Sequence, residues 1–163
     1  MKIIGIDPGL SGGIAILENN RVLNMFDMPV MSEGKKNKRQ LNSAQLVSLI
    51  KENISSNDEI AVVVEQVNAM PGQGVTSMFN FGQTFGAIKG VCAALELPIF
   101  FVRPSKWKKH FELINSSKDS SRTKAIEMYP ALSNQLAKKK DVNKSDAILI
   151  ARFHSETRLM DNI

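Results

Sequence analysis

Three acidic residues occupy similar settings in this sequence, which suggests a common role. Asp7 follows the apolar run 3–6, Glu65 ends the apolar run 60–64, and Asp146 opens the apolar stretch "DAILIA". Two central strands can bring Asp7 and Glu65 side by side, and a helix across the sheet end can add Asp146. Three carboxylates repel one another unless a cation lies between them. Oxygen ligands with few histidines favour Mg²⁺ or Mn²⁺, and such sites carry out two-metal phosphodiester hydrolysis.

Each of these acids also has a purely structural interpretation. Asp7 can cap the turn that begins at Pro8, and Glu65 can pair with a basic neighbour. Asp146 suits the positive N-terminal end of a helix dipole. Sequence spacing does not establish that the three side chains converge, so both interpretations stay open at this point.

Positive charge gathers in one part of the chain. The net charge is +5, and residues 101–140 contain ten Lys and Arg side chains against three acidic ones. A basic surface favours a polyanionic partner such as nucleic acid, although a solvated basic face is the alternative. The short run Lys35–Arg39 has the same two interpretations, a contact with DNA or a solvated loop.

The elements that position these residues follow from the apolar pattern. Strands are predicted at 2–7, 13–18, 22–28, 59–66 and 98–102, with a hairpin turn at "ENNR" and a loop at 32–40. Helices are predicted at 43–54, 77–96, from Pro104 through Trp107, at 122–129 and at 144–157. This order predicts an α/β fold with a mixed sheet and helices on both faces.

Two stripes mark the long helix predicted at 77–96. Met78, Phe81, Phe85, Ile88 and Cys92 have the spacing of a core-facing stripe, which makes Cys92 an inert core thiol. Gly82, Gly86 and Gly90 form a second stripe, and glycine costs a helix roughly 1 kcal/mol relative to alanine. We expect these glycines to pack closely inside the molecule; contact with a partner helix is the alternative.

Composition limits the class of protein. The 163 residues suit one domain, 1–163, and no apolar run is long enough to cross a membrane. Asp7 interrupts the N-terminal apolar run, so we expect no signal peptide. The single cysteine, Cys92, excludes an internal disulfide and is compatible with a reducing, cytoplasmic setting.

Several motifs together resemble a known family. "IIGIDPGLSGG", "VVVEQV" and "KSDAILIA", in this order, resemble the RuvC-type Holliday-junction resolvases of the RNase H-like superfamily. "MPGQGVTSMFNFGQTFG" and "RPSKWKK" resemble the compact branch of that family found in phages, which implies a bacterial or phage-infected host cell. The resemblance implies an RNase H-like five-stranded mixed sheet and homodimers that cut four-way DNA junctions and leave 5′-phosphates.

The resemblance also implies roles for individual residues. Asp7, Glu65 and Asp146 match the family's metal-binding acids, which hold two divalent ions, usually Mg²⁺, with Mn²⁺ able to substitute; Asp7 bridges them. Asn143 stands where the family often has a further acid or histidine, and it offers only a neutral carbonyl oxygen. Asn68 stands where bacterial members place an aromatic residue, and Met70 is a possible substitute. The basic residues expected at the DNA are Lys108 and Lys124, which match functional lysines, together with Arg122, Lys106 and Lys109.

Other interpretations remain at this stage. Trp107 either stacks on a base or anchors a helix, and His110 and His154 lack metal-ligand spacing. The same fold also serves nucleases for other branched DNA or RNA, and non-catalytic DNA-binding modules. ATP-handling domains of the actin and sugar-kinase type begin with a similar strand, but they need two large domains and 163 residues are too few.

Overall fold

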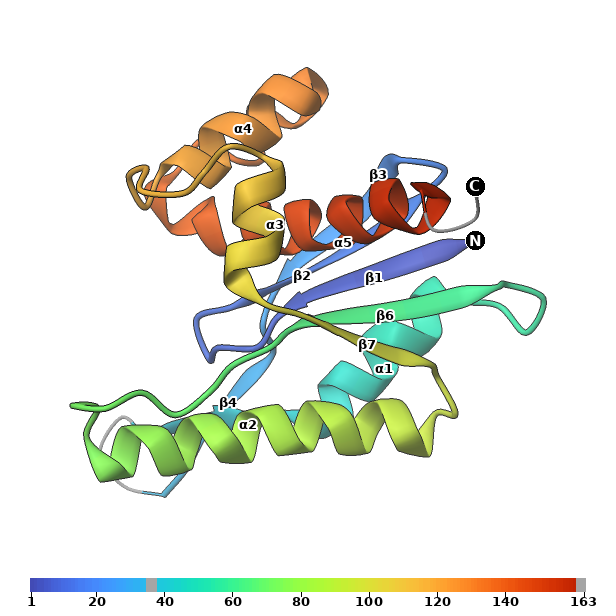
Figure 1. The fold of residues 1–163 in the computed structure, drawn as a ribbon. Coiled ribbons are helices and arrows are strands. Elements are labelled where there is room, and N and C mark those ends of the chain that lie inside the picture. The colour runs from blue at the N-terminus through green and yellow to red at the C-terminus, as the bar shows by residue number, and fades with distance from the viewer. Residues whose placement is uncertain (35–37, 161–163) are drawn as a thin grey trace.

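A mixed five-stranded sheet lies at the centre of the computed structural model, which describes residues 1–34 and 38–160 (Figure 1). Its strand order is β3-β2-β1-β6-β7, with β1, β2 and β3 antiparallel and with β6 and β7 parallel to β1. The strands are β1 Lys2–Asp7, β2 Gly13–Glu18, β3 Arg21–Asp27, β6 Ile60–Glu65 and β7 Ile99–Val102. The predicted mixed sheet is confirmed, and so is the hairpin turn, where Asn19 and Asn20 both have positive φ.

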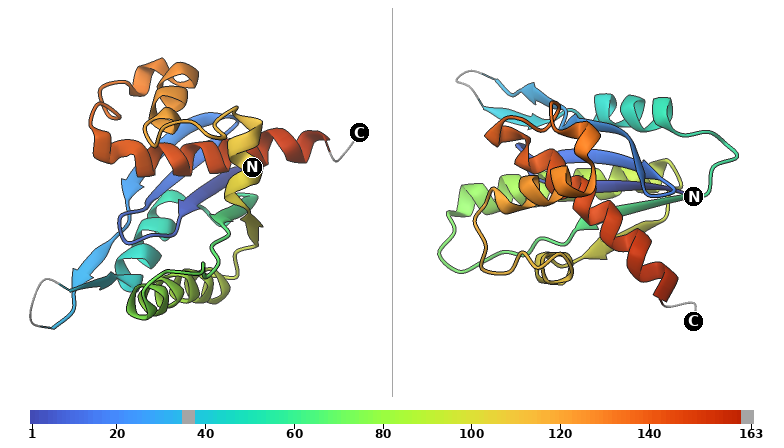
Figure 2. Two further views of the ribbon diagram at one scale, coloured as in Figure 1. Left: turned by 60° about the vertical axis from the view of Figure 1, so that its left-hand side comes forward. Right: turned by 90° about the horizontal axis from the view of Figure 1, so that it is seen from above.

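Helices cover both faces of this sheet, as Figures 1 and 2 show from three directions. Helices α3, α4 and α5 lie on one face, and α1 and α2 lie on the other. The helices are α1 Ser43–Asn53, α2 Val75–Ala94, α3 Pro104–His110, α4 Ser120–Met128 and α5 Val142–Met160, with short 3₁₀ turns at Pro130–Leu132 and Lys139–Asp141.

Alternation along the central strands decides which side chains face α5. Ile4 and Ile6 of β1 belong to the core under α1 and α2, whereas Ile3 belongs to the core under α5. Successive strand residues point to opposite faces, so Asp7 lies on the α5 side. Val63 of β6 also packs in the α5 core, and the same alternation places Glu65 on that side. The two acids therefore end neighbouring strands on one face.

Two glycines allow the N-terminal half of α5 to approach the sheet closely. A Cβ atom at Gly5 would lie 2.1 Å from the Ala147 carbonyl oxygen, and one at Gly13 would lie 2.6 Å from the Asn143 carbonyl oxygen. No other residue type leaves room for these backbone contacts. Because Asp146 lies between these two contact points on α5, the close approach brings it to the sheet end that carries Asp7.

The segment after β3 differs from the prediction. A two-stranded hairpin, β4 Val30–Ser32 and β5 Arg39–Leu41, stands where a loop was predicted at 32–40. Of the basic run Lys35–Arg39, residues 35–37 lie outside the described part of the chain. Strands of three residues are too short to give an alternating apolar signal, which is why the pattern missed them.

The two stripes of α2 have different outcomes. Ile88 and Cys92 are fully buried, and burial raises the pKa of the Cys92 thiol to about 11, so the prediction of an inert core cysteine is confirmed. The expectation of internal packing for the glycine stripe is wrong. Gly82, Gly86 and Gly90 are exposed, and a Cβ atom at any of them would meet nothing within 4 Å in the described residues.

Candidate active site

Asp7, Glu65 and Asp146 converge at the end of the central strands closest to the start of α5. Burial raises the pKa of Asp7 to about 7, and the charges of Glu65 and Asp146 add to the increase. Burial likewise raises the pKa of Asp146 to about 6, with a contribution from Glu65. The pKa of Glu65 is also raised, by burial. The charge of Glu65 thus acts on both aspartates, and that of Asp146 acts on Asp7.

The donor set suits a hard divalent cation. Asp146 Oδ1 is a buried oxygen without a hydrogen-bond partner in the described structure, which is an unfavourable state for a carboxylate unless a cation binds there. Among residues 1–34 and 38–160, however, no group of three acidic, histidine or cysteine side chains is arranged to hold a metal ion as it stands.

Neutral donors contact two of the acids. The Trp107 indole Nε1 donates a hydrogen bond of 2.9 Å to Glu65 Oε1, and this bond lowers the pKa of Glu65 against the effect of burial. A hydrogen bond from Ser121, at the start of α4, acts in the same direction on the pKa of Asp146. Trp107 is fully buried, which excludes the hypothesis that it stacks on a base and agrees with a helix anchor.

Two lysines bring positive charge to the carboxylates. Lys108 of α3 lowers the pKa of all three acids, so its ammonium group lies close enough to act on each of them. Lys118 lowers the pKa of Asp146 and lines, with that residue and Lys108, a cavity of about 160 Å³. Sequence reasoning missed Lys118 as a site residue. The available signal was a lysine in the polar loop "SSKDSS", a few residues before the helix predicted at 122–129.

The remaining predicted DNA-binding residues lie elsewhere. Lys124 pairs with Glu127 at 3.5 Å on α4, whereas the lysines that act on the pKa of the three acids are Lys108 and Lys118. Arg122 donates to both carboxylate oxygens of Asp119 at 2.7 Å, and to the Leu136 carbonyl oxygen. The structure therefore brings neither residue to the carboxylates.

The other candidate residues, Asn143, Lys106, Lys109, Asn68 and Met70, differ in their surroundings. Asn143 lies one helical turn before Asp146 and lines a separate cavity with Lys118, Lys139 and Lys140. Exposed positions are found for Lys106 and Lys109 on α3, and for Asn68 and Met70 in the loop after β6.

The two histidines have structural surroundings. His110 contacts Glu156 at 2.6 Å, and His154 packs on the Phe100 ring. Their positions agree with the absence of a metal-ligand spacing in the sequence.

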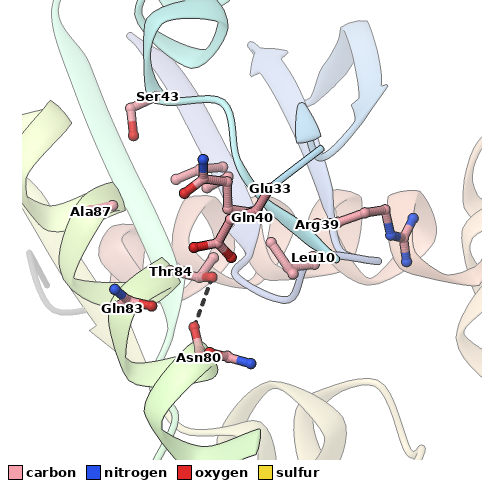
Figure 3. Close-up of a pocket in the computed structure, with 10 residues that line it drawn as sticks. Leu10, Glu33, Arg39, Gln40, Ser43, Asn80, Gln83, Thr84 and Ala87 are labelled. Carbon is pink, nitrogen blue, oxygen red and sulfur yellow. Dashed lines mark hydrogen bonds between the residues drawn. The ribbon is translucent and has the colours of Figure 1, made fainter. Parts of the chain in front are cut away.

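A polar cavity outside this site lies between the β4–β5 hairpin and α2 (Figure 3). It is lined by side chains such as Glu33, Arg39 and Gln40. On the α2 side of the cavity, Thr84 Oγ1 donates a hydrogen bond of 3.0 Å to the Asn80 carbonyl oxygen of the same helix. None of the three converging carboxylates lines it. In the described part of the chain, no helix has the length and apolar character needed to cross a membrane.

Comparisons with known proteins agree with this fold. A search of curated proteins finds no match. Among solved structures, Thermus thermophilus RuvC in complex with a Holliday junction substrate superposes with a TM-score of 0.64 and 17% identity, covering 98% of this chain and 96% of that one. A second T. thermophilus RuvC structure has a TM-score of 0.58 and 18% identity, covering 99% and 97%. At these identities the likeness shows the fold.

The family assignment comes from sequence. The family model described as "Crossover junction endodeoxyribonuclease RuvC" matches residues 3–154, a span that includes all three converging carboxylates together with Lys108 and Lys118. The chain therefore belongs to the RuvC family of crossover junction endodeoxyribonucleases, which hydrolyse phosphodiester bonds of DNA.

Proposed function

We propose that this enzyme resolves four-way DNA junctions with a metal site made by Asp7, Glu65 and Asp146. The convergence of these three carboxylates, with the pKa of each raised, carries the proposal. Nucleases of this family depend on divalent metal ions. We further propose that two ions bind, that Mg²⁺ is the usual ion with Mn²⁺ as a substitute, and that the products carry 5′-phosphates.

The acids have distinct positions in this scheme. Asp7 ends β1, between the strand end of Glu65 and the helix of Asp146, and is the acid whose pKa both others raise. This central position suits a ligand shared between two ions. Asn143, one turn before Asp146, supplies at most a neutral carbonyl oxygen. When bound, the ions supply Lewis acidity that activates water and stabilises the leaving 3′-oxygen.

The lysines act on the phosphate. Lys108 and Lys118 stand beside the carboxylates and hold positive charge where the scissile phosphate must bind. Their ammonium groups attract the phosphate and stabilise the negative charge that develops on it in the transition state. The exposed Lys106 and Lys109 on α3 extend this basic surface and suit contacts with the DNA backbone further from the cut.

Asp7→Asn tests this assignment. The substitution removes the charge of the central ligand while keeping its size, so we expect cleavage to fall at least 100-fold. The measurement uses a labelled four-way junction with Mg²⁺, with Mn²⁺ or with EDTA, and compares flaps, single-stranded DNA and RNA–DNA hybrids. Junction binding in EDTA should persist, because the basic surface is unchanged. Mg²⁺-dependent cleavage at the wild-type rate by Asp7→Asn would refute the metal site, and preference for a hybrid or flap would change the substrate.

We also propose that the enzyme is a homodimer that uses the exposed face of α2. Val75 is 80% exposed and Phe79 is 66% exposed, and Gly82, Gly86 and Gly90 continue the same face. A row of small residues beside exposed apolar ones allows two helices to approach closely. A four-way junction presents two opposed strands, and a symmetric dimer supplies one site for each.

A further inference from the structure

The strongest unassigned feature of the site is the contact between the only tryptophan and one of the acids. Trp107 is 0% exposed, and its Nε1–H donates to Glu65 Oε1 at 2.9 Å. An indole N–H is a donor only, so it can neither bind a cation nor exchange a proton with substrate. A buried donor of this kind fixes the orientation of its acceptor.

The position of the indole is itself strongly constrained. Trp107 packs in one apolar cluster with Val63, two residues before Glu65, and with Ala147, the residue after Asp146. Its helix, α3, is joined to α5 by the contact between His110 and Glu156 at 2.6 Å. The indole is therefore packed between the two elements that carry Glu65 and Asp146.

We propose that Trp107 is a positioning residue: its Nε1–H holds Oε1 of Glu65, so that the carboxylate keeps one orientation and offers Oε2 to the divalent ion. This inference rests on the proposed metal site. A hydrogen bond to one oxygen of a ligating carboxylate reduces the freedom that the side chain must lose when the ion binds. Trp107 thus acts through Glu65, and it touches neither the ion nor the substrate.

Because Trp107 is the sole tryptophan, biosynthetic labelling changes this position alone. Replacing it with benzothienylalanine, which has sulfur in place of the N–H, preserves ring size and removes the donor. We expect the Kd for Mn²⁺, measured calorimetrically, to increase about 10-fold, as is typical when a partner of a metal ligand is lost. Junction affinity in EDTA should not change. Cleavage at limiting metal should fall, and excess metal should restore much of it.

Two variants separate positioning from general packing. Phe111→Leu disturbs the same apolar cluster away from the acids, so it should lower stability and leave the Kd for Mn²⁺ unchanged. Glu65→Gln removes the negative charge of the ligand and one of its two carboxylate oxygens, and it should weaken Mn²⁺ binding at least as much as the analogue does. In the wild type, the single indole N–H resonance should exchange slowly with solvent and shift when Mg²⁺ is added.

The outcomes distinguish this inference from the function on which it rests. If the analogue binds Mn²⁺ as tightly as the wild type while Glu65→Gln binds it weakly, the positioning role is overturned and the metal site stands. If Glu65→Gln also binds as tightly as the wild type, the metal site fails and the positioning role fails with it. Equal loss of affinity in Phe111→Leu and in the analogue would show a packing effect and overturn the role of the N–H.

Discussion

At the residue scale, the surroundings of the three carboxylates disfavour their ionised form. Asp7 illustrates this, because burial and two neighbouring acids raise its pKa from 3.8 to about 7. An unfolded chain ionises this group near 3.8, so between these two values the folded protein binds more protons than the unfolded one. Without metal, the free energy of unfolding therefore decreases as the pH rises through this window. The stability that the protonated Asp7 contributes is complete only below the window.

Asp7→Asn should remove this dependence. In EDTA we expect the variant to be more stable than the wild type at pH 8, on the order of 1–2 kcal/mol, with little difference near pH 4. Urea unfolding at both pH values measures the effect. Asp58→Asn is a control of opposite sign, because the hydrogen bond from Lys2 lowers the pKa of Asp58 and the variant should lose stability at pH 8. A less stable Asp7→Asn at pH 8 would contradict the raised pKa.

Sequence alone identified the acids but only one of the two lysines beside them. An acid at the end of an apolar strand can be recognised in the sequence, because burying a lone carboxylate is unfavourable unless a partner or a cation compensates for it. Lys118 lies in a polar loop, and its direction depends on how that loop enters α4 at Ser120. Lys124 stands at the position of a functional lysine of the family, but in the structure it lies on α4 and pairs with Glu127. The apolar periodicity of a sequence does not indicate the direction of a side chain in a loop.

At the scale of elements, the packing of α5 on β1 sets the geometry of the site. The helix carries Asp146 and the strand carries Asp7, and the backbones nearly touch at Gly5. The order and type of the main elements followed from apolar periodicity. The contacts between them did not, because a glycine in a strand and a glycine in a helix look alike in sequence, and only the strand glycines Gly5 and Gly13 proved to be close contacts with α5.

Gly5→Ala should therefore displace α5. A Cβ atom at residue 5 would lie 2.1 Å from a backbone oxygen, and a backbone atom cannot rotate away as a side chain can. We expect a loss of about 1–3 kcal/mol in unfolding free energy, together with weaker Mn²⁺ binding as Asp146 shifts. Gly90→Ala is the matched control, since its Cβ would be in open space on α2 and should stabilise by up to about 1 kcal/mol. Similar stability changes for both variants would argue against the close contact.

At the scale of the whole molecule, the arrangement leaves one face without an internal role. The three carboxylates and two lysines gather on the α5 side of the sheet, whereas the exposed α2 face lies on the opposite side. Helix propensity disfavours three exposed glycines, so the stripe needs an explanation outside the folded chain. The proposed contact with a second copy provides such an explanation.

Gly86→Leu tests this contact because the folded chain leaves the position open. A Cβ atom at residue 86 would meet no described atom within 4 Å, and leucine has a higher helix propensity than glycine, so the monomer should fold. The added side chain keeps two α2 helices apart, and we expect sedimentation to show at least a 10-fold weaker dimer. On a supercoiled plasmid with a cruciform, the wild type should give linear product and the variant nicked circles. Glu52→Leu changes an exposed position on α1, and this variant should behave as the wild type in both assays. An unchanged dimer in Gly86→Leu would place the two-fold contact on another surface and leave the glycine stripe unexplained.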